Sequence, residues 1–306
     1  MTRKLFLHIG YPKTGTTALQ TEIFPSLREH GFYYAGNDEP TCASTARSFA
    51  ASVHNPESDF TLPVTEAENF LISCESITAD CLKYIDNAGK FTPHDPAGLA
   101  ARCRQAGTVF NPDNIRIIVT LRKQGELSHS LYAQSYTHFF SRDPAMMQFS
   151  QYAARLLAGS GIAAAYDFHA ITQELVKEFG RSNVLVLFHE DMVADPGRYL
   201  DELSGFIGQP LPAELPAVNV RLGSNGRHTQ TSSLYEEFAM LAKKHLPPTW
   251  SGLGRHLGFL RRIPARNSQV IEHDLTLESQ ITRAFSSTNR ALGLLLERDL
   301  SEIGYY

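Results

Sequence analysis

Several features that mark particular classes of protein are scarce or missing in this sequence. Its four cysteines, Cys42, Cys74, Cys81 and Cys103, form no Cys-x-x-Cys pair and no metal-ligand spacing, which favours reduced thiols over a disulfide framework. No apolar run approaches the length of a membrane span. The first residues lack the apolar core and small-residue cleavage site of a secretion signal. We therefore expect a cytoplasmic protein without a transmembrane segment.

An excess of positive charge is also missing. The 306 residues include 28 Lys or Arg and 32 Asp or Glu, which gives a formal net charge of −4. A general binder of nucleic acid or of anionic membranes would carry a basic face, so we expect neither as a partner. Hydrophobic residues make up 42% of the chain and charged residues 20%, close to ordinary globular usage. A chain of this length can bury a full core.

What the sequence does contain is an alternation of short apolar runs and helical stretches. Strands are predicted at residues 4–9, 69–74, 115–121 and 184–188, and helices at 18–29, 43–52, 96–105, 125–140, 170–179, 195–207, 234–244 and 278–300. This alternation predicts an α/β fold of three layers, with a central parallel sheet covered on both faces. We interpret residues 1–306 as a single domain, with insertions near 36–63, 139–165 and 247–266.

The most informative motif follows the first predicted strand and reads Gly10-Tyr11-Pro12-Lys13-Thr14-Gly15-Thr16-Thr17. A glycine-bounded turn before a helix aims backbone N–H groups at a phosphate, and the helix dipole adds positive potential. The spacing of the two glycines matches nucleotide-binding phosphate loops. However, Lys13 lies inside the loop, and Thr16 stands where an NTPase would have its lysine. We infer a phosphorylated ligand that is not an ordinary triphosphate.

A second constellation begins at the end of the third predicted strand. Arg122 leaves that strand, and Ser130 lies eight residues later in the next predicted helix. An arginine at a strand end and a hydroxyl near a helix start can clamp one phosphate between them. Glu75 ends the second predicted strand. Because ligands of open α/β sheets bind at the carboxyl ends of the strands, these residues are candidates for one site.

Taken together, the motifs resemble those of the sulfotransferases that use 3′-phosphoadenosine 5′-phosphosulfate (PAPS). The resemblance rests on Tyr-Pro-Lys-Thr-Gly-Thr-Thr, on Arg-x7-Ser, on the strand ending His189-Glu190-Asp191, and on the last residues Gly304-Tyr305-Tyr306, which look like those of bacterial members. It implies a P-loop-NTPase-like sulfotransferase fold over nearly the whole chain. The resemblance also implies that the 5′-phosphosulfate is held by Tyr11, Pro12, Lys13, Thr14, Gly15, Thr16 and Thr17, and the 3′-phosphate by Arg122 and Ser130.

The same resemblance implies roles in the chemistry. As the S–O bond breaks, negative charge grows on the bridging oxygen, and a cation aimed at that oxygen stabilises the transition state. Lys13 is the candidate for this cation. Glu75 is the candidate base, because a carboxylate in a partly dry cleft has a raised pKa; the alternative is a strand-end carboxylate paired with a nearby Arg or Lys. A late donor-binding segment is also implied, and Arg221 and Arg227 are its nearest candidates, with a solvated loop arginine as the equal alternative.

Other polar and aromatic residues point more to structure than to chemistry. His8 lies within the first strand and is interpreted as a satisfied core histidine, and for His129 a structural role is also favoured. His189 stands where many members of the resembling family have Tyr, so we give it only a marginal place among the candidates for contact with the adenine or a phosphate. An aromatic cluster at helical spacing favours core packing, with one edge that could stack on a sugar ring; it comprises Tyr132, Tyr136, His138, Phe139 and Phe140.

Two alternatives to a sulfotransferase stay open. A P-loop kinase or NTPase would need a lysine after Gly15 and a strand-end aspartate for Mg2+, which Asp191 faintly imitates. A catalytically inactive nucleotide-binding protein would be signalled by loss of Lys13 or Arg122, and both are present. For the leading interpretation we expect no metal and an acceptor hydroxyl on a carbohydrate or glycolipid, bound by the three insertions. The sequence permits a homodimer without indicating one.

Overall fold

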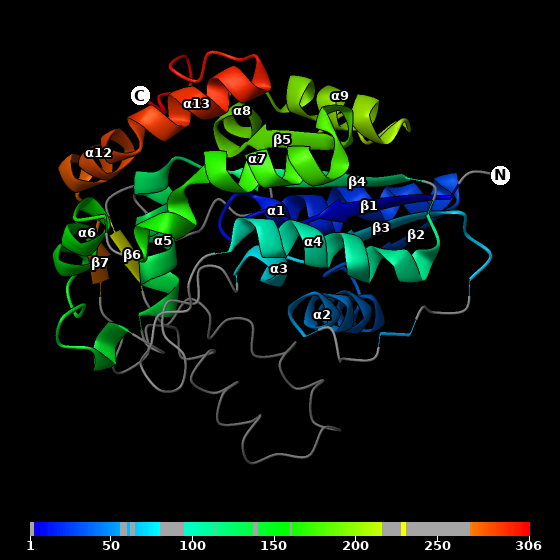
Figure 1. Cartoon of the computed structure of the whole chain (residues 1–306), viewed down its shortest axis with the longest axis horizontal. Helices are drawn as coiled ribbons and strands as arrows, with labels where there is room; N and C mark the ends of the chain where they lie inside the picture. Colours follow the sequence, from blue (N-terminus) through cyan, green and yellow to red (C-terminus); the bar gives the residue numbers. More distant parts are fainter. Residues whose placement is uncertain are drawn as a thin grey trace. The chain divides into compact units, whose positions relative to one another are not determined.

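The computed structural model describes residues 3–55, 60–61, 65–79, 95–112, 114–136, 140–159, 161–215, 228–230 and 270–306. Its centre is a sheet of five parallel strands in the order β2-β3-β1-β4-β5 (Figure 1). The strands are β1 (Lys4–His8), β2 (Phe32–Ala35), β3 (Asn69–Ser73), β4 (Asn114–Leu121) and β5 (Val184–Phe188). Four of them confirm the predicted strands. The fifth, β2, escaped prediction because its four residues at the sheet edge show no period.

The strand order fixes where a ligand can bind. β1 is central and pairs with β3 on one side and β4 on the other, so that Leu7 lies beside Ile72 and Ile117. Because all five strands are parallel, their carboxyl ends meet at one edge of the sheet. The loop that follows β1 therefore begins between the ends of β3 and β4, at the edge where open α/β sheets bind ligands.

Helical segments join the strands. They are α1 (Thr16–Ala18), η1 (Leu19–Ile23), η2 (Phe24–His30), α2 (Pro40–His54), α3 (Ser76–Ala79), α4 (Pro96–Gly107), η4 (Thr108–Phe110), α5 (Gln124–Ser135), η5 (Phe140–Arg142), α6 (Phe149–Leu157), η6 (Ala163–Tyr166), α7 (Phe168–Phe179), η7 (Arg181–Asn183), α8 (His189–Ala194), α9 (Pro196–Ile207), α12 (Leu275–Ala284) and α13 (Ser286–Leu296).

One face of the sheet is covered by the helical turns of residues 16–30 and by α9. Side chains from both pack on residues from all five strands, in a buried cluster of Phe6, Leu19, Ile23, Phe24, Leu27, Phe32, Tyr34, Leu71, Ile118, Leu185, Leu187, Tyr199, Leu200, Leu203 and Ile207. The start of α9 matches the sequence signal, since Asp195 accepts a hydrogen bond from the backbone of Arg198 at 3.0 Å and Pro196 begins the helix.

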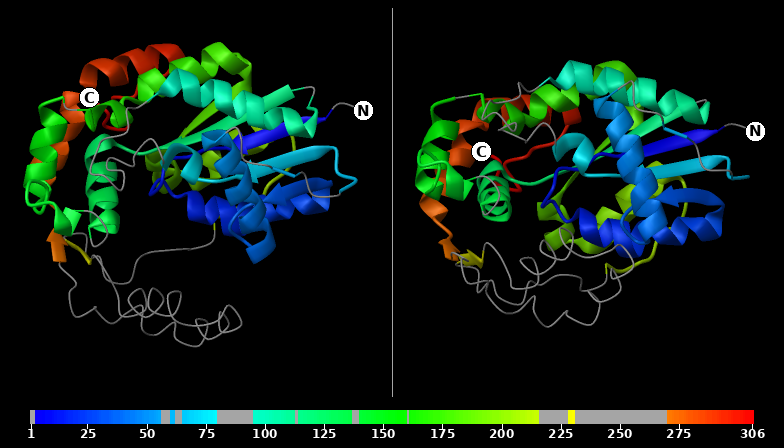
Figure 2. Two further views of the ribbon diagram at one scale, coloured as in Figure 1. Left: turned by 60° about the horizontal axis from the view of Figure 1, so that its bottom comes forward. Right: turned by 90° about the horizontal axis from the view of Figure 1, so that it is seen from below.

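The other face is covered by α4 and α7, and Figure 2 gives two further views of these layers. α4 approaches the sheet closely: a Cβ at Gly107 would lie 2.8 Å from the Ile115 side chain and 3.1 Å from Leu5. α2 packs on α4, and its buried Phe49 meets Phe110 edge to face with centroids 5.8 Å apart. Helices on both faces confirm the three-layer α/β prediction.

Several predicted helices differ from the observed ones. The predicted helix 18–29 is instead broken into α1, a π-helical turn and a 3-10 segment whose second residue is Pro25, a residue that disfavours the interior of an α-helix. α5 ends at Ser135 rather than at 140, and the predicted helix 278–300 is divided at Phe285 into α12 and α13. The predicted helix 234–244 and the segment 247–266 lie outside the described residues.

The chain divides into two compact units. The first comprises Met1–Gln124, Gly159–Val218 and Thr282–Tyr306, and contains the five-stranded sheet. The second comprises Gly125–Ala158 and Asn219–Ile281, with α6 and the antiparallel pair β6 (His228–Gln230) and β7 (Val270–Glu272). That the whole chain is one domain carrying acceptor-site insertions stays a prediction.

In the part of the chain described here, no helix has the length and apolar character that would let it cross a membrane.

Candidate functional site

The loop after β1 continues the parallel ladder before it turns. The N–H groups of Ile9 and Tyr11 donate to the carbonyls of Ile118 and Thr120 of β4 at 2.9 and 3.1 Å. Gly10 lies between them with almost no room beside its Cα, because a Cβ there would lie 1.9 Å from Thr120 Oγ1. The first glycine of the motif is therefore required by close packing on β4.

Side chains inside the loop hold its shape. Thr14 is fully buried, and its hydroxyl donates to the Tyr11 carbonyl at 2.6 Å and lies 2.7 Å from Thr120 Oγ1. Tyr11 is also fully buried and meets Phe168 edge to face, 5.2 Å between ring centroids. These two predicted donor-binding side chains thus face the interior, and Thr14 could reach a ligand only through its backbone.

Lys13 and Gly15 give the loop its turn. Both have left-handed backbone conformations, with φ of 68° at Lys13 and 87° at Gly15. Glycine adopts this region without cost, whereas a lysine there is strained, by about 1–3 kcal/mol. The side chain of Lys13 is half-buried rather than free in solvent. A strained, half-buried lysine at the carboxyl edge of the sheet fits a functional role better than a solvated loop position.

Helix α8 packs against the loop from the β5 side. A Cβ at Gly15 would lie 2.2 Å from Met192 Cε and 3.3 Å from His189 Cδ2. His189, given only a marginal place by the sequence, is therefore a neighbour of the loop. Met192 escaped prediction altogether, since nothing in its local sequence shows that α8 lies over a loop far earlier in the chain.

Glu75 lies at the end of β3 and contacts the start of the helical segment. Thr16 Oγ1 donates a hydrogen bond to Glu75 Oε1. Burial raises the pKa of Glu75 above its ordinary value, while the hydrogen bond from Thr16 and the positive charge of Lys13 act in the opposite direction. A carboxylate in this setting takes up a proton more readily than an exposed one, and it lies within electrostatic reach of Lys13.

Arg122 follows the last residue of β4 and also meets the loop. Its Nη1 donates to the backbone carbonyl of Lys13 at 3.3 Å. The structure therefore brings together three polar residues predicted from separate motifs: Lys13 after β1, Glu75 after β3 and Arg122 after β4. Their convergence follows from the central position of β1 in the parallel sheet.

A buried polar network lies beneath the loop. His8 is fully buried, and its Nδ1 is 2.7 Å from Ser73 Oγ, which also accepts from Gln20 Nε2 at 2.9 Å. Burial lowers the pKa of His8 to about 3, so the imidazole is neutral. His8 is thus a core residue, as expected, but it is only partly satisfied, because its buried Nε2 has no hydrogen-bond partner in the described part of the chain.

The remaining predicted donor residues are less defined. Pro12 is buried and Thr17 is exposed at the first turn of the helical segment. Ser130 is half-buried in α5, in the second unit, whereas Arg122 belongs to the first, so their joint grip on one phosphate stays a prediction. Arg221 and Arg227 lie outside the described residues.

The second unit contains a buried group of two imidazoles and a carboxylate. His273 Nδ1 is 2.7 Å from Glu278 Oε1, and the His273 ring stacks on His129 with centroids 3.7 Å apart. The three side chains are close enough to hold an ion after rearrangement. However, stacked rings place the two imidazoles face to face, whereas two that share an ion direct their nitrogens at it from separate directions. The observed geometry is that of hydrogen bonding and stacking.

The aromatic cluster predicted in this region is a core. Tyr132, Tyr136 and Phe140 are buried. The Tyr132 ring stacks on Phe140 with ring centroids 4.7 Å apart, and its centroid lies 5.4 Å from that of Tyr152. The other two members, His138 and Phe139, lie outside the described residues. Core packing, favoured from the helical spacing, is thus the role of the described members.

Comparisons with known proteins agree with this fold. Residues 102–240 match the family of sulfotransferase domains. The crystal structure of a sulfotransferase from Alicyclobacillus acidocaldarius is similar over 99% of this chain and 99% of its own, with 14% sequence identity and a TM-score of 0.54. No curated protein sequence matches significantly. The chain therefore has an α/β fold similar to that of this sulfotransferase, and residues 102–240, a little under half of the chain, match the sulfotransferase domain family, in agreement with the resemblance seen in the sequence.

Two more distant structures complete the comparison. Retinol dehydratase in complex with androsterone and the inactive cofactor PAP matches over 93% of this chain and 80% of its own, at 12% identity and a TM-score of 0.41. Mouse sulfotransferase SULT7A1 complexed with PAP matches over 69% of this chain and 60% of its own, at 15% identity and a TM-score of 0.38. Likenesses at these scores are too low to align individual residues. The family match includes Arg122 and Ser130 but begins after Lys13 and Glu75.

Proposed function

We propose that this protein transfers a sulfuryl group from PAPS to an acceptor hydroxyl. The observation that carries the proposal is the convergence of Lys13, Glu75 and Arg122 on one loop. Lys13 lies close enough to act electrostatically on the Glu75 carboxyl, and its carbonyl accepts from Arg122 at 3.3 Å. A cation, a base and a phosphate-binding guanidinium are the three groups that this reaction needs at the carboxyl edge of the sheet.

In the proposed reaction the acceptor oxygen attacks sulfur and forms the new S–O bond. The bond between sulfur and the bridging oxygen of the 5′-phosphate breaks, and its electron pair stays on that oxygen. Lys13 stabilises the charge that develops there, an effect worth more in a dry, preorganised site than in water. Glu75 takes the acceptor proton, and its partly buried setting gives the carboxylate the basicity that this step requires.

The proposal also assigns the groups that bind the donor, PAPS. The N–H groups of Thr16 and Thr17, at the start of the helical segment after Gly15, are proposed for the 5′-phosphate, whereas that of Ala18 already donates to the Gly15 carbonyl at 3.2 Å. Arg122 and Ser130 are proposed for the 3′-phosphate, with Arg221 or Arg227 covering it. Thr16 and Thr17 begin this helical segment, and Thr16 already contacts Glu75.

The acceptor is proposed to be a carbohydrate or glycolipid hydroxyl. The proposal rests on the Arg, His and aromatic residues that the sequence places in segments 36–63, 139–165 and 247–266. These segments differ in structure: 40–54 forms α2, whose buried side chains belong to the core, and 149–157 forms α6. The acceptor contacts are therefore expected from the remaining parts of these segments and from exposed helix faces. A cytoplasmic location and a homodimer likewise stay proposals.

One observation weighs against the kinase or NTPase alternative. That alternative assigns Asp191 to Mg2+, but both carboxylate oxygens of Asp191 accept hydrogen bonds from Arg298 at 2.6 Å. A carboxylate held in a two-point ion pair is already neutralised and hydrogen-bonded. Asp191 is thus better explained as a structural acid.

The experiment that tests the proposal has two arms. Titration with 3′-phosphoadenosine 5′-phosphate (PAP) and with ATP should give tighter binding for PAP. Transfer of radiolabelled sulfate from PAPS should then be measured over a panel of glycans, glycolipids and small alcohols. Preference for ATP would favour the kinase alternative, and PAP binding without transfer to any acceptor would favour an inactive nucleotide-binding protein.

A further inference from the structure

The C-terminal segment, defined here as residues 298–306, packs against the end of β5. The Tyr305 ring meets Phe188, the last residue of that strand, edge to face with centroids 5.2 Å apart. The Arg298 guanidinium lies 5.0 Å from the centroid of the Phe188 ring. Tyr305 and Leu300 are both fully buried, and the Tyr305 N–H donates to the Leu300 carbonyl at 3.1 Å. The last residues of the described chain therefore form part of the core at the carboxyl edge of the sheet.

Glu190 links this segment to the residue after Arg122. Its Oε1 accepts from the backbone N–H of Lys123 at 2.9 Å, and its Oε2 accepts from the Tyr305 hydroxyl at 3.3 Å. Lys123 lies between Arg122 and the first residue of α5, where backbone N–H groups lack helical acceptors. A carboxylate at this place caps the helix start and interacts favourably with its dipole. The turn that carries Arg122 is thus fixed by a carboxylate that Tyr305 orients.

A second connection fixes the next residue along the chain. Gln124 and Asn289 exchange amide hydrogen bonds at 2.7 and 3.1 Å, and Asn289 Nδ2 also donates to the Tyr305 carbonyl at 2.8 Å. Gln124 and Asn289 are fully buried. A buried polar network with its bonds satisfied has one favourable arrangement, so it constrains position more tightly than apolar packing alone. Both residues that follow Arg122 are therefore tied to Tyr305.

The docking of the segment does not depend on the Tyr305 hydroxyl. Arg298 binds Asp191 through two hydrogen bonds of 2.6 Å, and Leu300 and the Tyr305 ring are buried whatever the fate of the hydroxyl. A phenylalanine at 305 would keep the ring contact with Phe188. The hydroxyl can thus be removed while the segment stays in place, which separates its effect on Glu190 from its effect on folding.

We propose that Tyr305 is a positioning residue that aims the Arg122 guanidinium through Glu190 and Lys123. The inference rests on the proposed function, in which Arg122 binds the 3′-phosphate of the donor. A guanidinium that makes two parallel hydrogen bonds to a phosphate must be held within a fraction of an ångström and a few tens of degrees of its productive geometry. Loosening the turn behind it should therefore weaken contacts to the 3′-phosphate and leave those to the 5′-phosphate unchanged.

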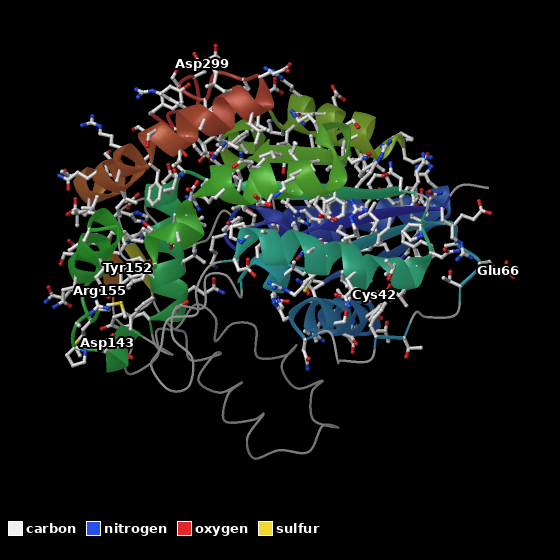
Figure 3. All side chains as sticks on the ribbon, viewed as in Figure 1. Cys42, Glu66, Asp143, Tyr152, Arg155 and Asp299 are labelled. Atoms are coloured by element: carbon white, nitrogen blue, oxygen red, sulfur yellow. The ribbon has the colours of Figure 1, made fainter. Side chains whose placement is uncertain are left out.

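The test compares Tyr305→Phe with Tyr306→Phe. Tyr306 is the matched control, because its hydroxyl also donates to a carboxylate, Asp299 Oδ1 at 2.9 Å, but at the surface. Figure 3 labels Asp299 on the outside of the C-terminal segment. The dissociation constants of PAP and of adenosine 5′-phosphate, which lacks the 3′-phosphate, are measured for parent and variants, with thermal unfolding as the check on folding.

The expected result is specific to one ligand. Tyr305→Phe should weaken PAP binding about threefold to tenfold, the usual effect of one hydrogen bond, and change adenosine 5′-phosphate binding by less than about twofold. Tyr306→Phe should change neither. Unchanged PAP binding in Tyr305→Phe, or equal weakening of both ligands, would overturn the positioning role while the proposed function stands. A parent protein that binds both nucleotides equally would overturn the 3′-phosphate clamp and the positioning role together.

A second variant keeps the inference falsifiable if Tyr305→Phe unfolds. Glu190→Gln retains an oxygen that can accept from Lys123 but removes the charge that Tyr305 orients. It should likewise weaken PAP binding more than adenosine 5′-phosphate binding. Equal effects of Glu190→Gln on the two ligands would contradict the inference. Where Tyr305→Phe folds, the two changes combined in a double-mutant cycle should be less than additive, because both interrupt one chain of contacts. Full additivity would show that Tyr305 acts independently of Glu190 and would contradict the inference.

Discussion

Arg122 donates a hydrogen bond to the backbone carbonyl of Lys13 across 109 positions of sequence, at 3.3 Å. The bond supports Lys13 in its left-handed conformation, with φ of 68°. A strained residue persists only where its surroundings hold it, so Arg122 has a structural task as well as its proposed role in ligand binding. The two predicted halves of the donor site are thereby joined by a direct hydrogen bond.

The first prediction concerns the lysine. Lys13→Ala should lower kcat for sulfuryl transfer about 100-fold or more, because a preorganised charge on the leaving oxygen is lost. Stability should change little, since the half-buried side chain leaves the core packing intact. Single-turnover transfer from labelled PAPS measures the effect. The control is Lys177→Ala, which removes an exposed lysine paired with Glu174 on α7. Equal rates for Lys13→Ala and the parent would remove the basis of the proposed mechanism.

The second prediction concerns the pH dependence of Glu75. A base must be ionised, so kcat should rise with pH through the pKa of Glu75, which burial places above the ordinary value of 4.5. Glu75→Gln keeps an oxygen that can accept from Thr16 but cannot take up a proton. This variant should lose about 100-fold to 10,000-fold in kcat and also lose the acid limb of the profile. A variant that retains that limb would show that another group is the base.

The raised pKa of Glu75 extends the second prediction to the stability of the protein. Its folded-state pKa is raised, so its contribution to stability is present at low pH and is lost as the pH rises through that pKa. Glu75→Gln cannot ionise and should escape this loss. The difference in unfolding free energy between variant and parent should therefore move in favour of the variant as the pH increases from about 4 towards neutrality. Denaturant titrations at several pH values would measure it.

The sequence was sufficient to predict the sheet strands that carry the site. The β-branched run at 115–121 and the apolar runs at 69–74 and 184–188 have the length and flanking turns of buried parallel strands. Because Lys13, Glu75 and Arg122 each follow such a run, the parallel arrangement alone predicted that they share an edge. The hydrogen bond from Arg122 to the Lys13 carbonyl and the electrostatic effect of Lys13 on Glu75 agree with this expectation.

What the sequence could not give are contacts between distant segments. Nothing local indicates that Thr14 bonds Thr120, that Met192 covers Gly15, or that the C-terminal segment reaches the turn after β4. Helix ends were also misplaced: α5 stops at Ser135, where no following glycine or proline marks the end in the sequence. A sequence motif indicates the chemistry of a residue. The residues that hold its side chain in place come from distant segments, and only the fold shows which segments these are.

The third prediction compares two glycines. Gly10→Ala would place a Cβ 1.9 Å from Thr120 Oγ1, so it should destabilise the fold by about 1–3 kcal/mol through overpacking and disturb the loop. Gly205→Ala in α9 meets no heavy atom within 4 Å and should stabilise the helix by about 0.4–1 kcal/mol. Denaturant unfolding of both variants measures the two changes in unfolding free energy. Equal changes would show that the loop can accommodate a Cβ at Gly10, which would contradict the close packing on Thr120.

The fourth prediction concerns metals. Sulfuryl transfer through Lys13 needs no ion, so dialysis against EDTA should leave the transfer rate within about twofold of the untreated protein, and added Mg2+ should restore nothing. The buried group of His129, His273 and Glu278 makes this worth measuring directly, since Zn2+ prefers such side chains. Loss of transfer on chelation with recovery on adding Mg2+ would contradict a metal-free transfer step, and recovery with Zn2+ alone would favour an ion at that group.

The last prediction tests whether Arg122 and Ser130 grip one phosphate. Arg122→Lys keeps the charge but loses the planar fork, and Ser130→Ala removes a hydroxyl, so each should weaken PAP binding about threefold to thirtyfold. Neither should affect adenosine 5′-phosphate to the same degree. Arg102→Ala, which removes a half-buried arginine paired with Asp95, is the control. If both residues bind one phosphate, the double variant should lose less than the product of the single effects, because the weakened clamp has less left to lose. Strict additivity would mean that the two residues contact different parts of the nucleotide, and unchanged affinity for Ser130→Ala would remove that residue from the site.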